Sequence, residues 1–177
     1  MSSDETTVNV MGYDIEKLVE NAVKDVIGKS NPHENRKPEK MTLSLARQIV
    51  ERVKTKAKET GVNAVVAIAD AGANVITVDC MDDAFIASYD IAVNKAFTSV
   101  ALKMSTYDLG KSAQPGGTLY GIQNTNNGRI VIFGGGEPLE VDGKVIGGLG
   151  VSGGTAEQDT FLGSYGRQVF EELCKKQ

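Results

Sequence analysis

The chain has few of the residue types that build metal centres and disulfide frameworks. Its 177 residues include two cysteines and one histidine. Cys80 and Cys174 lie far apart and have no C-x-x-C partner, which argues against a zinc site and fits a reducing compartment. The histidine, His33, lies in a polar, proline-containing stretch, where a solvated side chain is more common than a metal ligand.

Other absences narrow the class of protein. No apolar run approaches the roughly 20 residues that a membrane span needs, and the acidic start MSSDETTVNV lacks the basic region of a secretory signal. The net charge of −4 leaves no basic stripe to bind phosphates. We therefore expect a cytoplasmic protein that binds neither nucleic acid nor membrane.

Residues 1–28 are predicted to form an amphipathic helix after a disordered start. In YDIEKLVENAVKDVIGKS, Asp14 can cap the helix and Gly28 can end it. Apolar residues recur with helical spacing at Ile15, Leu18, Val19, Ala22, Val23, Val26 and Ile27. Residues 29–40, KSNPHENRKPEK, contain two prolines and six charges, which predicts an extended linker. The helix either packs on the domain or is a detachable docking helix.

Residues 41–177 are predicted to form one α+β domain. Periodicity and turn residues give the order helix, two strands, helix, loop, three strands, helix. The strands are NAVVAIA and VITVDCM around DAGAN, then GRIVIFGGG, then a hairpin with an Asp142-Gly143 turn in PLEVDGKVIGGLGV. The helices cover about 45–57, 85–104 and 155–174. Tight turns between consecutive strands indicate an antiparallel sheet.

The stretch VIGGLGVSGGTAEQD contains G-x-G-x-x-G, yet we predict no NAD site. A dinucleotide motif opens a parallel βαβ unit, whereas here only one helix follows. Gly147, Gly148 and Gly150 permit close approach of another backbone or of a flat ligand. Thr155 and Gln158 form a capping box. Ser152, Gly153 and Gly154 present N–H groups at a helix start, which suits either a subunit contact or a pocket for a carboxylate or phosphate.

Several segments together resemble the GlcG/HbpS/PduO C-terminal family, which is often labelled haem-binding or DUF336-like. They are VVAIADAGANVI, MDDAFIASYDIAVNKAF, QPGGTLYGI and GRIVIFGGGEPLEVDGKVIGGLGVSGGTAEQD. Within the family, the chain looks closest to OrfY-type members encoded near diol and glycerol dehydratase genes. The resemblance implies a profilin-like fold with a five-stranded antiparallel sheet flanked by helices. It also implies a homo-oligomer, often an octamer, that binds haem or a cobalamin-type corrinoid in a pocket partly shared between subunits.

The N-terminal segment is similar to encapsulation peptides, which bring cargo into bacterial microcompartments. This resemblance implies that residues 14–28 bind a shell protein and that the protein lies in the microcompartment lumen.

The expected cofactor-binding residues come from four places: the QPGGTLYG loop, one helix, one strand start and the glycine-rich helix start. They are Lys95, Pro115, Gly116, Gly117, Tyr120, Arg129, Ser152, Gly153, Gly154 and Glu157. Lys95 lies mid-helix among small polar residues, where its ammonium can meet an acidic ligand group or a facing carboxylate.

The iron ligand is left open by the sequence. Many family members carry histidine in the segment that here reads GIQNTNNGR, with Gln123 and Asn127. The other candidates are Tyr120, Met81, Met104 and Cys80, because haem also accepts tyrosine, methionine or thiolate.

Two further hypotheses stand beside an accessory tetrapyrrole-binding protein. One is an enzyme for a small acid or aldehyde, with acid–base residues among Asp70, Asp90, Glu157 and Asp159, three of which (all but Asp90) can hold a metal. The other is a structural cargo protein without a cofactor. Because the domain has no nucleophile–histidine pair, a serine or cysteine hydrolase would lack its base.

Overall fold

The computed structural model describes residues 9–10, 13–14, 17–21 and 37–175. The chain divides into two units, Met1–Arg36 and Lys37–Gln177. In the first unit, β1 (Asn9–Val10) pairs antiparallel with β2 (Tyr13–Asp14), and residues 17–21 are helical.

The predicted N-terminal helix is described only in part. Leu18 and Val19 lie in the helical residues 17–21, and both are more than half exposed. The other members of the predicted stripe lie outside the described residues: Ile15, Ala22, Val23, Val26 and Ile27. Asp14, the predicted cap, is instead paired in β2.

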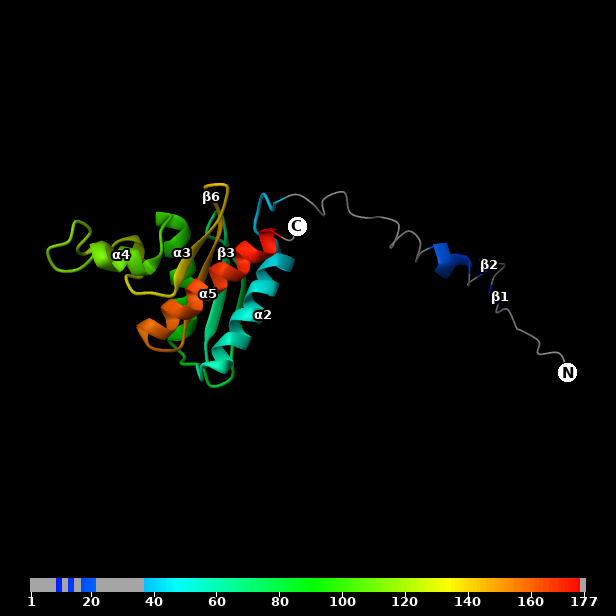
Figure 1. Ribbon diagram of the computed structural model, residues 1–177, viewed down its shortest axis with the longest axis horizontal. Coiled ribbons are helices and arrows are strands. Elements are labelled where there is room, and N and C mark those ends of the chain that lie inside the picture. Colours follow the sequence, from blue (N-terminus) through cyan, green and yellow to red (C-terminus); the bar gives the residue numbers. More distant parts are fainter. Residues whose placement is uncertain (1–8, 11–12, 15–16, 22–36, 176–177) are drawn as a thin grey trace. The chain divides into compact units, whose positions relative to one another are not determined.

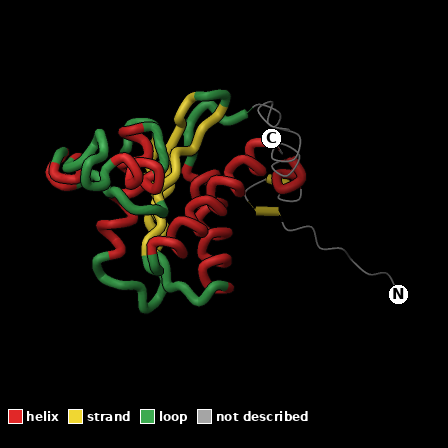
Figure 2. The backbone as a smooth tube through the Cα atoms, turned by 60° about the vertical axis from the view of Figure 1, so that its left-hand side comes forward, coloured by secondary structure: helices red, strands yellow, loops and turns green. Residues whose placement is uncertain are grey.

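The second unit is a layered α+β structure. Its described residues form one antiparallel sheet in the order β4-β3-β6-β5. Helices α2 (Leu43–Glu59) and α5 (Ala156–Lys175) pack on one face of the sheet, and α3 (Ser88–Leu102) packs on the other. Figure 1 shows two of these strands, β3 and β6, with the helices α2, α3 and α5. Figure 2 shows the strands between these helical layers.

Turn chemistry fixes both predicted hairpins. Strands β3 (Val65–Asp70) and β4 (Val75–Cys80) are joined by a turn in which Asp70 Oδ1 accepts the Gly72 N–H at 2.8 Å. Between β5 (Gly136–Val141) and β6 (Lys144–Ser152), Asp142 and Gly143 have φ of 49° and 77°. Two positive φ values are typical of a type I′ turn, whose twist matches that of the strands. Both hairpin predictions are confirmed.

Alternation along the strands separates two cores. Val66 and Ile68 of β3 belong to the large core under α2 and α5, whereas Val65 and Ala67 contact α3. Because successive side chains of a strand point to opposite faces, the residues of this central strand from Val65 to Ala69 are all apolar. The resulting sheet holds the ends of β5 and β6 in place beside α3 and α5.

The glycine-rich strand has its close neighbour within the same chain. A Cβ at Gly150 would lie 1.9 Å from the carbonyl oxygen of Ala92, and one at Gly148 would lie 2.6 Å from that of Ala96. Both carbonyls belong to α3, so these glycines let the helix lie directly on the sheet. This strand lies inside the sheet between β3 and β5.

The prediction of a five-stranded sheet is wrong in strand number, because the sheet in the described residues has four strands. The predicted strand GRIVIFGGG is irregular up to Gly135. Instead of pairing with a strand, the backbone of this segment is hydrogen-bonded to a side chain of α3. Thr98 Oγ1 of α3 accepts the N–H of Val131 at 3.0 Å and donates to the carbonyl of Arg129 at 3.2 Å. These bonds take the place of a strand ladder.

A short helix follows α3 where the sequence suggested a loop. Lys103 ends α3 in the left-handed conformation, with φ of 53°. Helix α4 (Thr106–Ser112) then begins at Ser105, whose hydroxyl accepts the N–H of Asp108 at 3.0 Å. This helix supplies one wall of the site described next.

Candidate functional site

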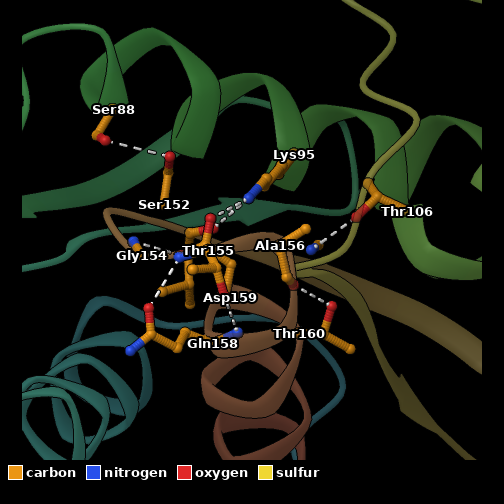
Figure 3. A network of polar contacts seen from close by, with 12 residues as sticks. Ser88, Lys95, Thr106, Ser152, Gly154, Thr155, Ala156, Gln158, Asp159 and Thr160 are labelled. Atoms are coloured by element: carbon orange, nitrogen blue, oxygen red, sulfur yellow. Dashed lines mark hydrogen bonds and ion pairs between the residues drawn. The ribbon is translucent and has the colours of Figure 1, made fainter. Parts of the chain in front are cut away.

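A fully buried ion pair joins α3 to the start of α5. Lys95 has an exposed fraction of 0% and Asp159 of 3%. The Lys95 ammonium donates to Asp159 Oδ2 at 2.7 Å and to the carbonyl of Val151 at 2.7 Å. Figure 3 shows Lys95 extending from α3 toward Asp159. Burial lowers the pKa of Lys95, and the neighbouring Asp159 carboxylate opposes this effect.

The start of α5 is held by two sets of contacts within the chain. Thr155 and Gln158 form the predicted capping box: each backbone N–H donates to the other's side-chain oxygen, at 2.9 Å and 3.2 Å. Asp159 Oδ1 also accepts the N–H of Gly154 at 2.9 Å. The carboxylate facing this helix start is therefore that of Asp159 itself (Figure 3).

A cavity of about 580 Å³ opens beside this pair. It lies between α4, the loop 132–134 and the first turns of α5. Its lining residues are Tyr107, Gly110, Lys111, Gln114, Ile132, Phe133, Gly134, Ala156, Glu157, Thr160 and Phe161. The three aromatic side chains are each about half exposed. Ligand pockets typically measure about 300–1,000 Å³ and are mainly apolar with few polar groups, a description that fits this cavity.

The polar groups of the cavity lie on α4 and α5. The Lys111 ammonium lies 2.8 Å from Asp108 Oδ1 and 4.2 Å from the centroid of the Tyr107 ring. The hydrogen bond to Asp108 raises the pKa of Lys111, and the same contact lowers the pKa of Asp108. Because this pair is exposed to solvent, the Lys111 ammonium can exchange its partner for an acidic group of a ligand.

A second groove, of about 710 Å³, adjoins the cavity at Tyr107 and Thr160. Its most buried acid is Glu137 of β5, which has an exposed fraction of 5%. Glu137 lies 3.8 Å from the Arg167 guanidinium and accepts a long hydrogen bond from Ser164 at 3.5 Å. Burial raises the pKa of Glu137, an effect that Arg167 reduces.

Two of the predicted site residues lie close to the cavity. Glu157 lines it directly. Lys95 lies behind it, with the ammonium 4.9 Å from the centroid of the lining Phe133 ring. Ser152, another of the predicted residues, is buried, and its hydroxyl donates to the Ser88 hydroxyl at 3.2 Å. The remaining glycines of this group, Gly153 and Gly154, lie at the turn before α5.

The other predicted residues lie away from the cavity lining. Pro115, Gly116, Gly117 and Tyr120 follow α4, directly after the lining residue Gln114. Tyr120 is 65% exposed. The Arg129 guanidinium stacks on the Phe97 ring at 3.7 Å and donates to the Asn94 side chain at 3.4 Å.

None of the four candidate iron ligands lines the cavity. Cys80 is exposed, Met81 accepts the Ala64 N–H at 3.4 Å, and Met104 lines the second groove. The fourth is the exposed Tyr120. His33 lies outside the described residues.

The proposed metal-binding acids do not converge. Asp70 binds its own turn and Asp159 binds Lys95, and no cluster of three such ligands occurs among the described residues. The helices described by the structure also include none with the length and hydropathy needed to cross a bilayer.

Sequence reasoning missed α4, and with it Tyr107 and Lys111. A local signal was present, because Ser105 and Asp108 match the S-x-x-D pattern of a helix start. The Ser105 hydroxyl does bind both the backbone and the carboxylate of Asp108.

Residues 41–166 match the family described as haem degrading protein HbpS-like. The chain belongs to this family. The HbpS-like domain therefore covers nearly all of the second unit, including both walls of the cavity. The family resemblance predicted from the glycine-rich segments is confirmed.

Relatives of this HbpS-like protein agree with that assignment. A 15.0 kDa protein from the dhaT–dhaS intergenic region of Citrobacter freundii is 47% identical over 133 residues, which are 75% of this chain and 94% of that protein. The crystal structure of Klebsiella pneumoniae ORFY is 41% identical with a TM-score of 0.73, covering 78% of this chain and 95% of ORFY. The crystal structure of a PduOC:heme complex is 36% identical with a TM-score of 0.71, covering 73% and 94%.

Proposed function

We propose that this HbpS-like domain binds haem in the cavity between α4, residues 132–134 and the start of α5. The observation that supports the proposal most is the cavity itself, about 580 Å³ in volume and walled by Tyr107, Phe133 and Phe161. Aromatic side chains present flat apolar faces to a planar ligand. The likeness to PduOC, whose crystal structure contains haem, adds the choice of ligand.

The residues present fit haem in three respects. Phe133 and Phe161 offer apolar surface to the macrocycle, and Lys111 offers an ammonium to a propionate group. Among the described residues that line the cavity, Tyr107 is the one of a type that ligates haem iron. Bound haem supplies an iron that changes oxidation state and binds small ligands. The cavity residues orient the macrocycle and exclude water from its apolar face.

Titration of the purified protein with hemin tests this proposal. We expect a saturable shift of the Soret band with one haem per chain. Tyr107→Phe removes the hydroxyl that can ligate iron, so the Soret position should change even if haem still binds. Tyr120→Phe is the matched control, because Tyr120 is exposed and outside the cavity. An unchanged spectrum in Tyr107→Phe would show that Tyr107 does not ligate the iron. The absence of a saturable shift in the wild type would contradict the proposal that the domain binds haem.

A corrinoid is the alternative tetrapyrrole, implied by the resemblance to the PduO C-terminal family. Competition distinguishes the two. We expect hemin to stay bound in the presence of excess hydroxocobalamin. Displacement of hemin by hydroxocobalamin at equal concentration would assign the cavity to the corrinoid.

We also propose that the N-terminal segment docks the protein to a microcompartment shell. The helical residues 17–21 present Leu18 and Val19 to solvent, as helix-in-groove binding requires. In shell-producing cells, a fluorescent fusion of the full chain should form foci, and the variant Leu18→Glu/Val19→Glu should be diffuse. Asn21→Glu, on the same helical turn, is the control and should keep the foci. Diffuse wild-type fluorescence would contradict docking.

We also propose that the protein self-associates through the loop before α3. The family resemblance implies that the oligomer is an octamer. In this loop Phe85 is 71% exposed and Ile86 98% exposed, which is costly for large apolar side chains in a monomer. Sedimentation should show an oligomer that Ile86→Glu dissociates and that Leu43→Glu, at an exposed position of α2, leaves intact. A monomeric wild type would contradict this proposal.

A further inference from the structure

The buried ammonium of Lys95 contacts three different groups. Two are the oxygens of Asp159 and Val151, each at 2.7 Å. The third is the face of the Phe133 ring, whose centroid lies at 4.9 Å. Because an aromatic face carries negative electrostatic potential, a cation at this distance attracts it. Phe133 is thus in contact with a cation on one side and lines the cavity on the other.

The loop that carries Phe133 is closely packed between α3 and α5. At Gly135, whose φ is +112°, a Cβ would lie 2.5 Å from the carbonyl oxygen of Val151 and 2.8 Å from Lys95 Nζ. At Gly134 a Cβ would lie 1.8 Å from Thr160 Oγ1. The Gly135 carbonyl also accepts the N–H of Val151 at 2.9 Å. The backbone beside Phe133 therefore has little freedom, and the Lys95 ammonium contacts the ring itself.

Attraction of an anionic ligand does not explain the lysine. Asp159 balances its charge at hydrogen-bond distance, so the pair is neutral as a unit. A buried pair of this kind often adds little stability compared with apolar residues of similar volume. What an apolar replacement cannot supply is the contact between a cation and the Phe133 ring.

We propose that Lys95 is a positioning residue that fixes the Phe133 ring as a rigid wall, against which a flat aromatic ligand stacks. The ligand class rests on the proposed function. The rigid wall itself does not, and it is measurable without any ligand. Because the ring is already ordered before the ligand binds, binding loses less conformational entropy and is more favourable.

Because the chain contains no tryptophan, Phe133→Trp introduces a single indole, whose fluorescence can be excited apart from that of the tyrosines. We compare it alone with the combination Phe133→Trp/Lys95→Met/Asp159→Asn, which removes both charges with side chains of similar volume and keeps an amide oxygen that can accept the Gly154 N–H. With Lys95 present, the indole should show high anisotropy and partial quenching by acrylamide, because Phe133 is 44% exposed. In the combined variant, anisotropy should fall and quenching should rise about twofold, because a cation–π contact at a partly exposed ring contributes about 0.5 kcal/mol. Equal quenching in the two proteins overturns the proposal.

A matched control separates this effect from general loosening of α3. Phe133→Trp/Ser88→Ala removes the hydrogen bond between Ser88 and Ser152, which joins the same helix to the same strand. Its quenching should equal that of Phe133→Trp. If it rises as much as in the ion-pair variant, Lys95 has no special role, and the proposal is overturned.

Hemin titration then tests the consequence for binding. Lys95→Met/Asp159→Asn should weaken hemin binding in the presence of Phe133 and have no further effect in a Phe133→Leu background. Equal losses in the two backgrounds would mean that Lys95 does not act through the ring. If the wild type binds no hemin while the quenching result holds, the haem proposal fails and the positioning role stands.

Discussion

At the scale of single residues, Glu137 of β5 is a buried acid, with an exposed fraction of 5%. Burial raises its pKa in the folded state above 4.5, and Arg167 and Ser164 of α5 compensate only in part. Asp108 of α4 raises this pKa further. Protonation thus favours the folded state. The stability contribution of Glu137 is complete below about pH 4.5 and is lost as the pH rises through the folded-state pKa.

The variant Glu137→Gln is neutral at every pH and should avoid this loss. We expect its melting temperature to exceed that of the wild type by an amount that grows from about pH 4 to about pH 8. Thermal unfolding monitored by circular dichroism measures the difference. Glu140→Gln, exposed on the same strand, should leave the melting temperature unchanged. A gain that shrinks with rising pH would contradict the assignment of Glu137 as a buried acid.

Gly150 permits the contact between β6 and α3. In Gly150→Ala the new methyl group would lie 1.9 Å from the carbonyl of Ala92, so the helix must shift. Overpacking of this kind costs about 1–3 kcal/mol or more. Gly72→Ala is the control, because its Cβ meets only the side-chain ends of Asn74 and Asp70. Urea unfolding should show a clear loss for the first variant and a small one for the second; equal losses would contradict the close helix contact.

At the scale of elements, the start of α5 forms part of the cavity wall through Ala156 and Glu157. Thr155→Ala removes the cap that binds Gln158 N–H and should cost about 1 kcal/mol of unfolding free energy. Thr155→Ser keeps a capping hydroxyl and should cost much less. Because Asp159 still holds Gly154, we expect α5 to remain in place. Loss of the folded state in Thr155→Ala would show that Asp159 does not anchor the helix start.

Most elements could be predicted because their signals are local. Alternation and turn residues identify both hairpins, and helical spacing identifies α2, α3 and α5. The segment 130–132 is an apolar run, which has the same appearance whether it forms a strand or a buried irregular segment. Its partner, Thr98, lies on α3, 33 positions before Val131. No local pattern reports that contact, and the fifth strand was therefore predicted wrongly.

At the scale of the whole molecule, the candidate site assembles residues that are distant in sequence. Lys95 was identified from its small polar neighbours, but its partner Asp159 lies 64 positions away. The sequence suggested a facing carboxylate without naming one. Tyr107 and Lys111 were missed because α4 spans only seven residues, too short for a periodic pattern. Glu157 was predicted and lines the cavity, whereas Arg129 and Tyr120 lie outside its lining.

Blocking the cavity tests the central claim most directly. Ala156 is exposed and lines the cavity, so Ala156→Trp fills the space without disturbing the core. Ser44→Trp, at an exposed position of α2, is the control. In a hemin titration, we predict saturable binding by the wild type and by Ser44→Trp, with affinity at least about tenfold lower for Ala156→Trp, a loss of about 1.4 kcal/mol. Undiminished binding by Ala156→Trp would show that haem does not occupy this cavity.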